Sequence, residues 1–174
     1  PGRDQRAARR VAVSRTVAQG VREARGEWSN GATTWLLDVN VLLALLDPTH
    51  PHHAPAHAWF ATVRASWASC SVTENGALRI MSHPRYGNAV ASAAIAAELL
   101  AELCSQPGHV YWAADLSLLD SPLVDRRRLL ASDQITDTWL LALAVQRGGK
   151  LATFDKRLVT GAVQGGAAAL HVIA

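Results

Sequence analysis

Residues 34–46 read Thr-Trp-Leu-Leu-Asp-Val-Asn-Val-Leu-Leu-Ala-Leu-Leu, and this stretch decides the fold. Residues 34–37 form an apolar run of the length of a buried strand, and residues 40–46 continue as a helical segment. A strand that leads directly into a helix is the first half of a β-α-β unit, from which parallel sheets are built. The stretch therefore predicts an α/β protein that carries Asp38 at the carboxyl end of its first strand.

The same alternation continues to the end of the chain. Further helices are predicted over residues 51–67 and 88–104, and between them another helix stops before Pro84. Ser132 is the predicted N-cap of the last helix, which ends before Gly148. Strands in alternation with helices predict a mostly parallel central sheet that helices flank on both sides. The further predicted strands are residues 69–73, 110–113, 151–154 and 170–173.

The composition is that of one globular domain with an appended segment. Of the 174 residues, 49% are hydrophobic and 18% are charged, which is enough apolar material for a core. No apolar run approaches the roughly 18 residues that a membrane-spanning helix needs, and the N-terminal region lacks the apolar stretch of a secretory signal. Cys70 and Cys104 lie in apolar surroundings, which favours reduced core residues of a cytoplasmic protein; a single disulfide is the open alternative.

The appended segment is residues 1–32, and the predicted domain is residues 33–174. Residues 1–30 hold seven arginines and three acidic residues, a net charge of +4, whereas the rest of the chain has a net charge of −1. The basic charge of the chain therefore does not itself indicate that the domain binds nucleic acid. Apolar residues at helical spacing indicate that the segment is an arginine-rich amphipathic helix followed by a linker: Val13, Val17, Val21, Ala24 and Trp28.

Four acidic residues lie near the points where strand-like runs give way to a loop or a helix: Asp38, Glu74, Asp137 and Asp155. The carboxyl ends of parallel strands meet at one edge of a sheet, where ligands bind in α/β proteins. Carboxylates that gather there repel one another unless a cation lies between them. The pattern predicts a divalent-metal site, and each residue taken alone also fits a turn or a helix cap.

Carboxylate oxygens favour Mg²⁺ or Mn²⁺, and such sites commonly serve phosphoryl or phosphodiester chemistry. Asp133 lies one helical turn before Asp137, where a helix-cap role is favoured and an accessory role at the metal stays open. A second metal option is the i,i+4 pair His53 and His57, a spacing that suits Zn²⁺. Because no acidic or cysteine partner stands beside this pair, a surface helix start is favoured for the whole cluster of His50, His52, His53 and His57.

Four motifs in order resemble those of the PIN-domain ribonucleases, and most of all those of the VapC-type toxins of bacterial toxin–antitoxin pairs. The resemblance covers about residues 34–174 and lacks a counterpart for the appended segment. The motifs are Leu-Leu-Asp38-Val-Asn40-Val-Leu-Leu-Ala-Leu, Thr73-Glu74-Asn75-Gly-Ala-Leu-Arg79, Thr136-Asp137-Thr-Trp-Leu-Leu-Ala-Leu-Ala and Leu-Ala-Thr153-Phe-Asp155.

The resemblance implies a PIN-like fold and a metal-dependent endoribonuclease whose acidic set is Asp38, Glu74, Asp137 and Asp155. It implies hydrolysis of RNA, such as tRNA or rRNA, by water that Mg²⁺ or Mn²⁺ activates. Asn40, Thr136 and Thr153 match polar positions that support the acids. Basic residues of the domain are candidates for contacts with RNA phosphates: Arg79, Arg85, Arg126, Arg127, Arg128, Lys156 and Arg157.

The resemblance also implies protein partners, namely a cognate antitoxin and either a second copy of the chain or a toxin–antitoxin hetero-oligomer. Antitoxins of this kind lay a C-terminal segment on the toxin, and residues 1–32 resemble such a segment. Two interpretations of residues 1–32 are open. They are an antitoxin-like or antitoxin-derived piece that directs an arginine to the acidic pocket, or an upstream extension without that role.

Two other functions fit part of the pattern. Small-molecule phosphohydrolases also carry an aspartate after the first strand, but they generally have a second acid two residues later, where this chain has Asn40. A non-catalytic module would use the acidic pocket only to bind an arginine of a partner, and the presence of all four acids argues against it. RNA cleavage that requires Mg²⁺ and is lost in Asp38→Asn distinguishes the three functions.

Overall fold

The computed structural model describes residues 33–174, and the predictions for residues 1–32 lie outside the described residues. Five strands form a sheet in the order β3-β2-β1-β4-β5, and each neighbouring pair is parallel. This arrangement confirms the predicted α/β class with its parallel sheet. The strands are β1 (Trp35–Leu37), β2 (Trp67–Cys70), β3 (His109–Trp112), β4 (Lys150–Thr153) and β5 (Leu170–Val172).

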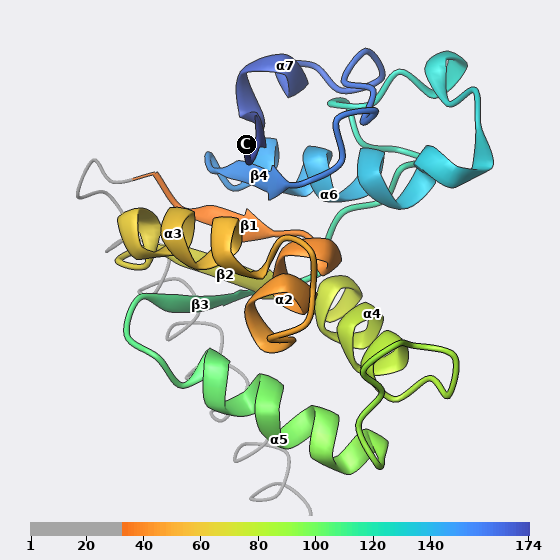
Figure 1. The fold of residues 1–174 in the computed structure, drawn as a ribbon. Coiled ribbons are helices and arrows are strands. Elements are labelled where there is room, and N and C mark those ends of the chain that lie inside the picture. Colours follow the sequence, from red (N-terminus) through yellow and green to blue (C-terminus); the bar gives the residue numbers. More distant parts are fainter. Residues whose placement is uncertain (1–32) are drawn as a thin grey trace, which may run out of the picture. The chain divides into compact units, whose positions relative to one another are not determined.

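Helices cover both faces of the sheet, as predicted (Figure 1). On one face lie α2 (Val39–Leu46), α3 (His53–Val63) and α5 (Ala93–Cys104), and on the other lie α6 (Ile135–Gln146) and α7 (Gly166–Ala169). The helix α4 (Ser71–Met81) follows β2 and packs against α2 and α5. Short 3-10 turns are η1 (Arg126–Arg128) and η2 (Ser132–Gln134).

The packing of the core explains why the sequences of the strands are continuous apolar runs. Leu36 and Leu151 point to the α6 side of the sheet, and Leu37 and Ala152 point to the side of α2, α3 and α5. All four residues are fully buried, so neither face of these strands carries a polar stripe. Each leucine buried in this way contributes about 1.5–3 kcal/mol relative to an exposed one.

The strand order sets the position of the functional edge. From β1 the chain moves to β2 and β3 on one side, and it later crosses to β4 and β5 on the other side. The direction of winding therefore reverses between β1 and β4, the position where open α/β sheets form ligand crevices. Asp38 directly follows β1, and its backbone N–H donates to the Ala152 carbonyl of β4 at 3.0 Å. Asp155 follows β4 by two residues.

The segment around β2 departs from the prediction. Trp67 was predicted in a helix, but it begins β2 and is fully buried. The strand predicted over residues 69–73 ends at Cys70, because the Thr73 hydroxyl accepts from the Cys70 N–H and donates to the Cys70 carbonyl, which starts α4 at Ser71. Glu74 therefore lies inside α4 and not at a strand end.

Three smaller features complete the description. The helix predicted over residues 88–104 begins at Ala93, where the Ser92 hydroxyl accepts from the Ile95 N–H. Cys70 and Cys104 are both free thiols, and Cys70 is buried in the core as expected for a reduced residue. Within residues 33–174, no helix has the length and apolar character to cross a bilayer.

Candidate active site

A cavity of about 570 Å³ opens where β1 and β4 end. Three of the four predicted acids line it, namely Asp38, Asp137 and Asp155. They come from the β1–α2 junction, the first turn of α6 and the loop after β4. The fold thus gathers carboxylates that lie up to 117 positions apart in the chain. The other lining residues are Val39, Asn40, Leu43, Val72, Asn75, Gly76, Arg79, Ile80 and Thr136.

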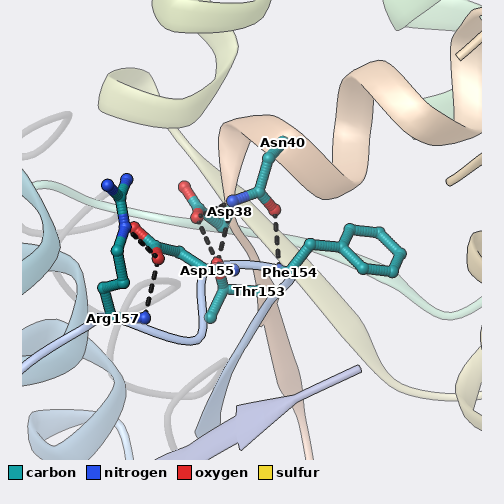
Figure 2. A network of polar contacts seen from close by, with 6 residues as sticks. All are labelled: Asp38, Asn40, Thr153, Phe154, Asp155 and Arg157. Atoms are coloured by element: carbon teal, nitrogen blue, oxygen red, sulfur yellow. Dashed lines mark hydrogen bonds and ion pairs between the residues drawn. The ribbon is translucent and has the colours of Figure 1, made fainter. Parts of the chain in front are cut away.

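The Asp38 carboxylate is held in one orientation. Asp38 is buried and caps α2, since its Oδ1 accepts from the Val39 N–H at 2.6 Å. Its Oδ2 accepts from the Thr153 hydroxyl and from the Asn40 side-chain amide, each at 2.7 Å (Figure 2). A carboxylate offers about four lone-pair sites, so one on Oδ1 stays available for a ligand in the cavity.

Thr153 and Asn40 tie the two strand ends together. The buried Thr153 hydroxyl accepts from Asn40 Nδ2 at 2.9 Å and from the Asp155 N–H at 3.0 Å. The Asn40 Oδ1 accepts from the Phe154 N–H at 3.1 Å. Two of the three residues predicted to support the acids, Asn40 and Thr153, therefore bond directly to Asp38 and to the loop that carries Asp155 (Figure 2).

Negative charge accumulates in the cavity. Burial, together with the charges of Asp38, Asp155 and Asp133, raises the pKa of Asp137 to about 6. Burial is also the main cause that raises the pKa of Asp38, and the Asp155 charge adds to it. Carboxylates whose pKa is raised in this way are stabilised in their charged forms by a cation between them.

The donors of the cavity fit a hard divalent cation. Its ionisable ligands are carboxylates, and in the part of the chain that the structure describes no histidine or cysteine lines it. Oxygen ligands of this kind suit Mg²⁺ and Mn²⁺. The Arg157 guanidinium pairs with Asp155 at 3.4 Å, but its side chain is 91% exposed, and surface pairs of this type are weak.

Glu74, the fourth predicted acid, is placed elsewhere. It does not line the cavity, and its Oε1 accepts from the Ser69 hydroxyl at 2.5 Å. The face of α4 that lines the cavity carries Asn75, Gly76 and Arg79. A Cβ atom at Gly76 would lie 2.6 Å from a methyl group of Val39, so glycine allows α4 to approach α2 closely here.

The remaining predicted residues divide between the cavity and the surface. Thr136 and Arg79 line the cavity, whereas Asp133 is exposed in η2 outside the lining and acts on Asp137 through its charge. Arg127 and Arg128 pair with Asp125 at 3.0 and 3.7 Å. The further predicted phosphate contacts are exposed and do not line the cavity: Arg85, Arg126, Lys156 and Arg157.

The histidine cluster lies at the start of α3, as expected, and two of its rings also bond the end of α2. A ring nitrogen of His53 bonds the Ala44 carbonyl at 2.8 Å, and one of His57 bonds the Leu45 carbonyl at 3.0 Å. These carbonyls belong to the last turn of α2, which otherwise leaves them without partners. His52 stacks on Phe154 with ring centroids 4.4 Å apart.

Sequence reasoning missed a group of polar residues around Glu74. Cys104 and His109 each offer a ligand atom near the Glu74 carboxylate, and Ser69 lies between them. A signal existed in the sequence, because Pro107-Gly108 predicts a turn that brings the residues on either side of it together.

Comparison with known proteins places this geometry in a family. Residues 35–162 match the model of the PIN domain. Among curated proteins of Mycobacterium tuberculosis strain H37Rv, the chain is 47% identical to Ribonuclease VapC44 over 131 residues, which is 75% of this chain and 92% of that protein. It is 41% identical to Ribonuclease VapC39 over 133 residues, 76% of this chain and 96% of the relative.

A third relative, Ribonuclease VapC38 of the same organism, is 39% identical over 130 residues, which cover 74% of this chain and 90% of the relative. Matches of this extent cover nearly the whole of each relative and most of the described domain. The chain therefore belongs to the PIN-domain family and, within it, to the VapC-type proteins.

Proposed function

We propose that the chain is a metal-dependent endoribonuclease that hydrolyses RNA phosphodiester bonds and acts as the toxin of a toxin–antitoxin pair. The observation that carries the proposal is the meeting of Asp38, Asp137 and Asp155 in one cavity, with the pKa of Asp137 raised to about 6. The names of the relatives, which describe ribonucleases, support the class of reaction.

Asp38, Asp137 and Asp155 would hold Mg²⁺ or Mn²⁺ in the cavity. When bound, such a cation lowers the pKa of water and neutralises charge on a phosphodiester. Asp38 supplies the oxygen Oδ1 with its remaining lone pair, and Asp137 and Asp155 supply the charge that favours a divalent ion. The donor set therefore fits the cofactor in chemistry and in charge.

The other polar residues position the acids and the substrate. Thr153 and Asn40 hold the Asp38 carboxylate, so it need not reorient when a ligand enters. Arg79 lines the cavity, and its guanidinium can donate to two oxygens of one phosphate. The acidic cavity repels a polyanion, and Arg79 together with the cation offsets that repulsion.

The substrate and partners follow from the same charges. A structured RNA such as tRNA or rRNA is the proposed substrate, and a cognate antitoxin is the proposed inhibitor. An arginine of the antitoxin would enter the acidic cavity and replace the cation, because a guanidinium bonds carboxylates in pairs. Residues 1–32 carry seven of the chain's arginines and are one candidate source of such a group.

RNA cleavage by the full chain and by residues 33–174 tests the proposal. We expect cleavage with Mg²⁺ or Mn²⁺, loss of cleavage in EDTA and in Asp38→Asn, and unchanged cleavage in the control Asp120→Asn, which alters an exposed aspartate outside the cavity. Sequencing of the RNA 5′ ends identifies the bond that is cut. RNA that stays intact with both chains and both metals contradicts the proposal and favours a binding module.

Asn40 also bears on the phosphohydrolase alternative. Its amide donates to Asp38, so the second acid that such enzymes generally carry is replaced here by a hydrogen-bond donor. We expect no hydrolysis of p-nitrophenyl phosphate under conditions in which RNA is cleaved.

A further inference from the structure

A second polar cluster lies on the face of the sheet that α5 covers. The Glu74 carboxylate, the Cys104 thiol and a ring nitrogen of His109 offer ligand atoms that all lie within 4.8 Å of one another. Each of the three side chains is half-buried, so the group is open to solvent ions. We call Ser69, Glu74, Cys104 and His109 the Glu74 cluster; none of its members lines the acidic cavity.

The Ser69 hydroxyl lies among the three ligand atoms. It donates to Glu74 Oε1 at 2.5 Å, its oxygen is 2.8 Å from His109 Nε2, and it is 4.0 Å from the Cys104 sulfur. Ser69 is fully buried and has a single proton to donate. When Ser69 donates that proton to Glu74, the Ser69 oxygen can only accept from His109 Nε2. The two atoms then form a hydrogen bond only if the ring carries a proton on Nε2.

A neutral imidazole ring carries one proton, on only one of its two nitrogens. Since Nε2 faces Ser69, the proton of a neutral His109 ring can lie on Nδ1, the nitrogen that does not face the Ser69 hydroxyl. A neutral ring that donates from Nδ1 presents the lone pair of Nε2 to the cluster. Metal-binding histidines are oriented in this way, with one nitrogen on a carbonyl and the other on the ion.

We propose that Glu74, Cys104 and His109 bind a transition-metal ion of the Zn²⁺ class, with the Ser69 hydroxyl or a water as fourth ligand. Carboxylate oxygen, thiolate sulfur and imidazole nitrogen together are ligands typical of Zn²⁺, and a thiolate disfavours Mg²⁺. Ligands of a tetrahedral zinc ion lie roughly 3.3–3.8 Å apart. Side-chain rotations that close the present spacing by about 1 Å therefore complete the site.

The backbone around the cluster is suited to a fixed site. Cys104 ends α5 and His109 begins β3, and between them Gly108 has a φ of +87°. A Cβ atom at Gly108 would collide with the Arg64 carbonyl oxygen, so only glycine fits this turn. A bound ion would join α4, α5 and β3, which makes the proposed site structural and independent of the acidic cavity.

Titration of the full chain with Co²⁺, which replaces Zn²⁺ and reports thiolate ligands by a charge-transfer absorption band, tests the site. We expect the band to saturate at one equivalent and to disappear when Zn²⁺ is added. The band should be absent from Cys104→Ser and retained in the control Cys70→Ala, which alters the chain's other cysteine. It should also be retained in Asp38→Asn, so that the two proposed metal sites are tested separately.

A second measurement guards against variants that fail to fold. Zn²⁺ affinity, measured by competition with a chromophoric chelator, should fall at least about tenfold in His109→Gln and in Glu74→Gln. Circular dichroism confirms that these variants are folded. The proposal is overturned if the wild-type chain gives no thiolate band, or if the folded variants bind Zn²⁺ as tightly as the wild-type chain.

Discussion

The acidic cavity and the Glu74 cluster are two polar sites on the same sheet, and they differ in the ligand atoms that accompany their carboxylates. Within residues 33–174, the cavity gathers three aspartates where β1 and β4 end, and its ionisable metal ligands are carboxylate oxygens. The Glu74 cluster offers one oxygen, one sulfur and one nitrogen beside β2 and β3. The difference shows that an acidic residue near the end of a strand contributes to the site toward which the following helix orients its side chain.

The largest effect is expected for Asp38→Asn. The substitution removes the charge of the carboxylate that Thr153 and Asn40 hold in place, and with it a ligand of the proposed cation. We expect RNA cleavage to fall on the order of 10²–10⁴-fold, the equivalent of several kcal/mol of transition-state stabilisation. Initial rates with a labelled RNA measure it, with Asp120→Asn as control. A rate within twofold of wild type would remove Asp38 from the active site.

Thr153→Val tests whether the cavity depends on its supporting hydrogen bonds. The change leaves Asp38 Oδ2 with one donor fewer and deprives Asn40 Nδ2 and the Asp155 N–H of an acceptor. We expect a loss of about 1–3 kcal/mol in the free energy of unfolding, with weaker Mg²⁺ binding. Urea titration measures the first quantity. Thr62→Val, which alters an exposed hydroxyl of α3, is the control and should change the stability little.

The pH dependence of the free energy of unfolding, measured in EDTA, tests the ionisation of the cavity carboxylates. The pKa of Asp137 is raised from 3.8 to about 6, so its contribution to stability is fully present below pH 3.8 and is lost as the pH rises through about 6. Asn mimics the protonated acid at every pH. The urea midpoint of wild type should therefore fall relative to that of Asp137→Asn between pH 4 and pH 7. Parallel curves for the two proteins would show that folding does not raise the pKa of Asp137.

Of these substitutions, Glu74→Gln should have the smallest effect on RNA cleavage. It tests directly whether Glu74 belongs to the acidic cavity. Because Glu74 bonds Ser69 and does not line the cavity, we expect cleavage within about twofold of wild type. The amide oxygen can still accept from Ser69, so the free energy of unfolding of the metal-free protein should change by less than about 1 kcal/mol. A loss of cleavage as large as in Asp38→Asn would place Glu74 in the acidic cavity after all.

The strand that precedes Asp38 could be predicted from the sequence because local and tertiary preferences agree there. Leu36 and Leu37 form a run that is buried on both faces, and Asp38 is a good helix N-cap at its end. The same agreement placed Asp155 after β4 and Asp137 near the start of α6. Three of the carboxylates could be brought together on this reasoning alone.

Glu74 could not be placed because local preference and the observed structure disagree around it. Val72 and Thr73 are β-branched and favour a strand, yet both lie in the first turn of α4, where the Thr73 hydroxyl caps the helix. Each residue of a helix turns the side-chain direction by about 100°. An early helix start therefore directs Glu74 toward Ser69, while Asn75 and Arg79 face the cavity.

A crystal of the full chain grown with Mn²⁺ tests the separation of the two sites most directly, through the anomalous scattering of the ion. We predict one or two Mn²⁺ peaks in the acidic cavity, bound by Asp38 Oδ1 and the carboxylates of Asp137 and Asp155, with Glu74 still bonded to Ser69. A Mn²⁺ ion in the acidic cavity that has Glu74 among its ligands, or the absence of Mn²⁺ from the cavity, would contradict the account.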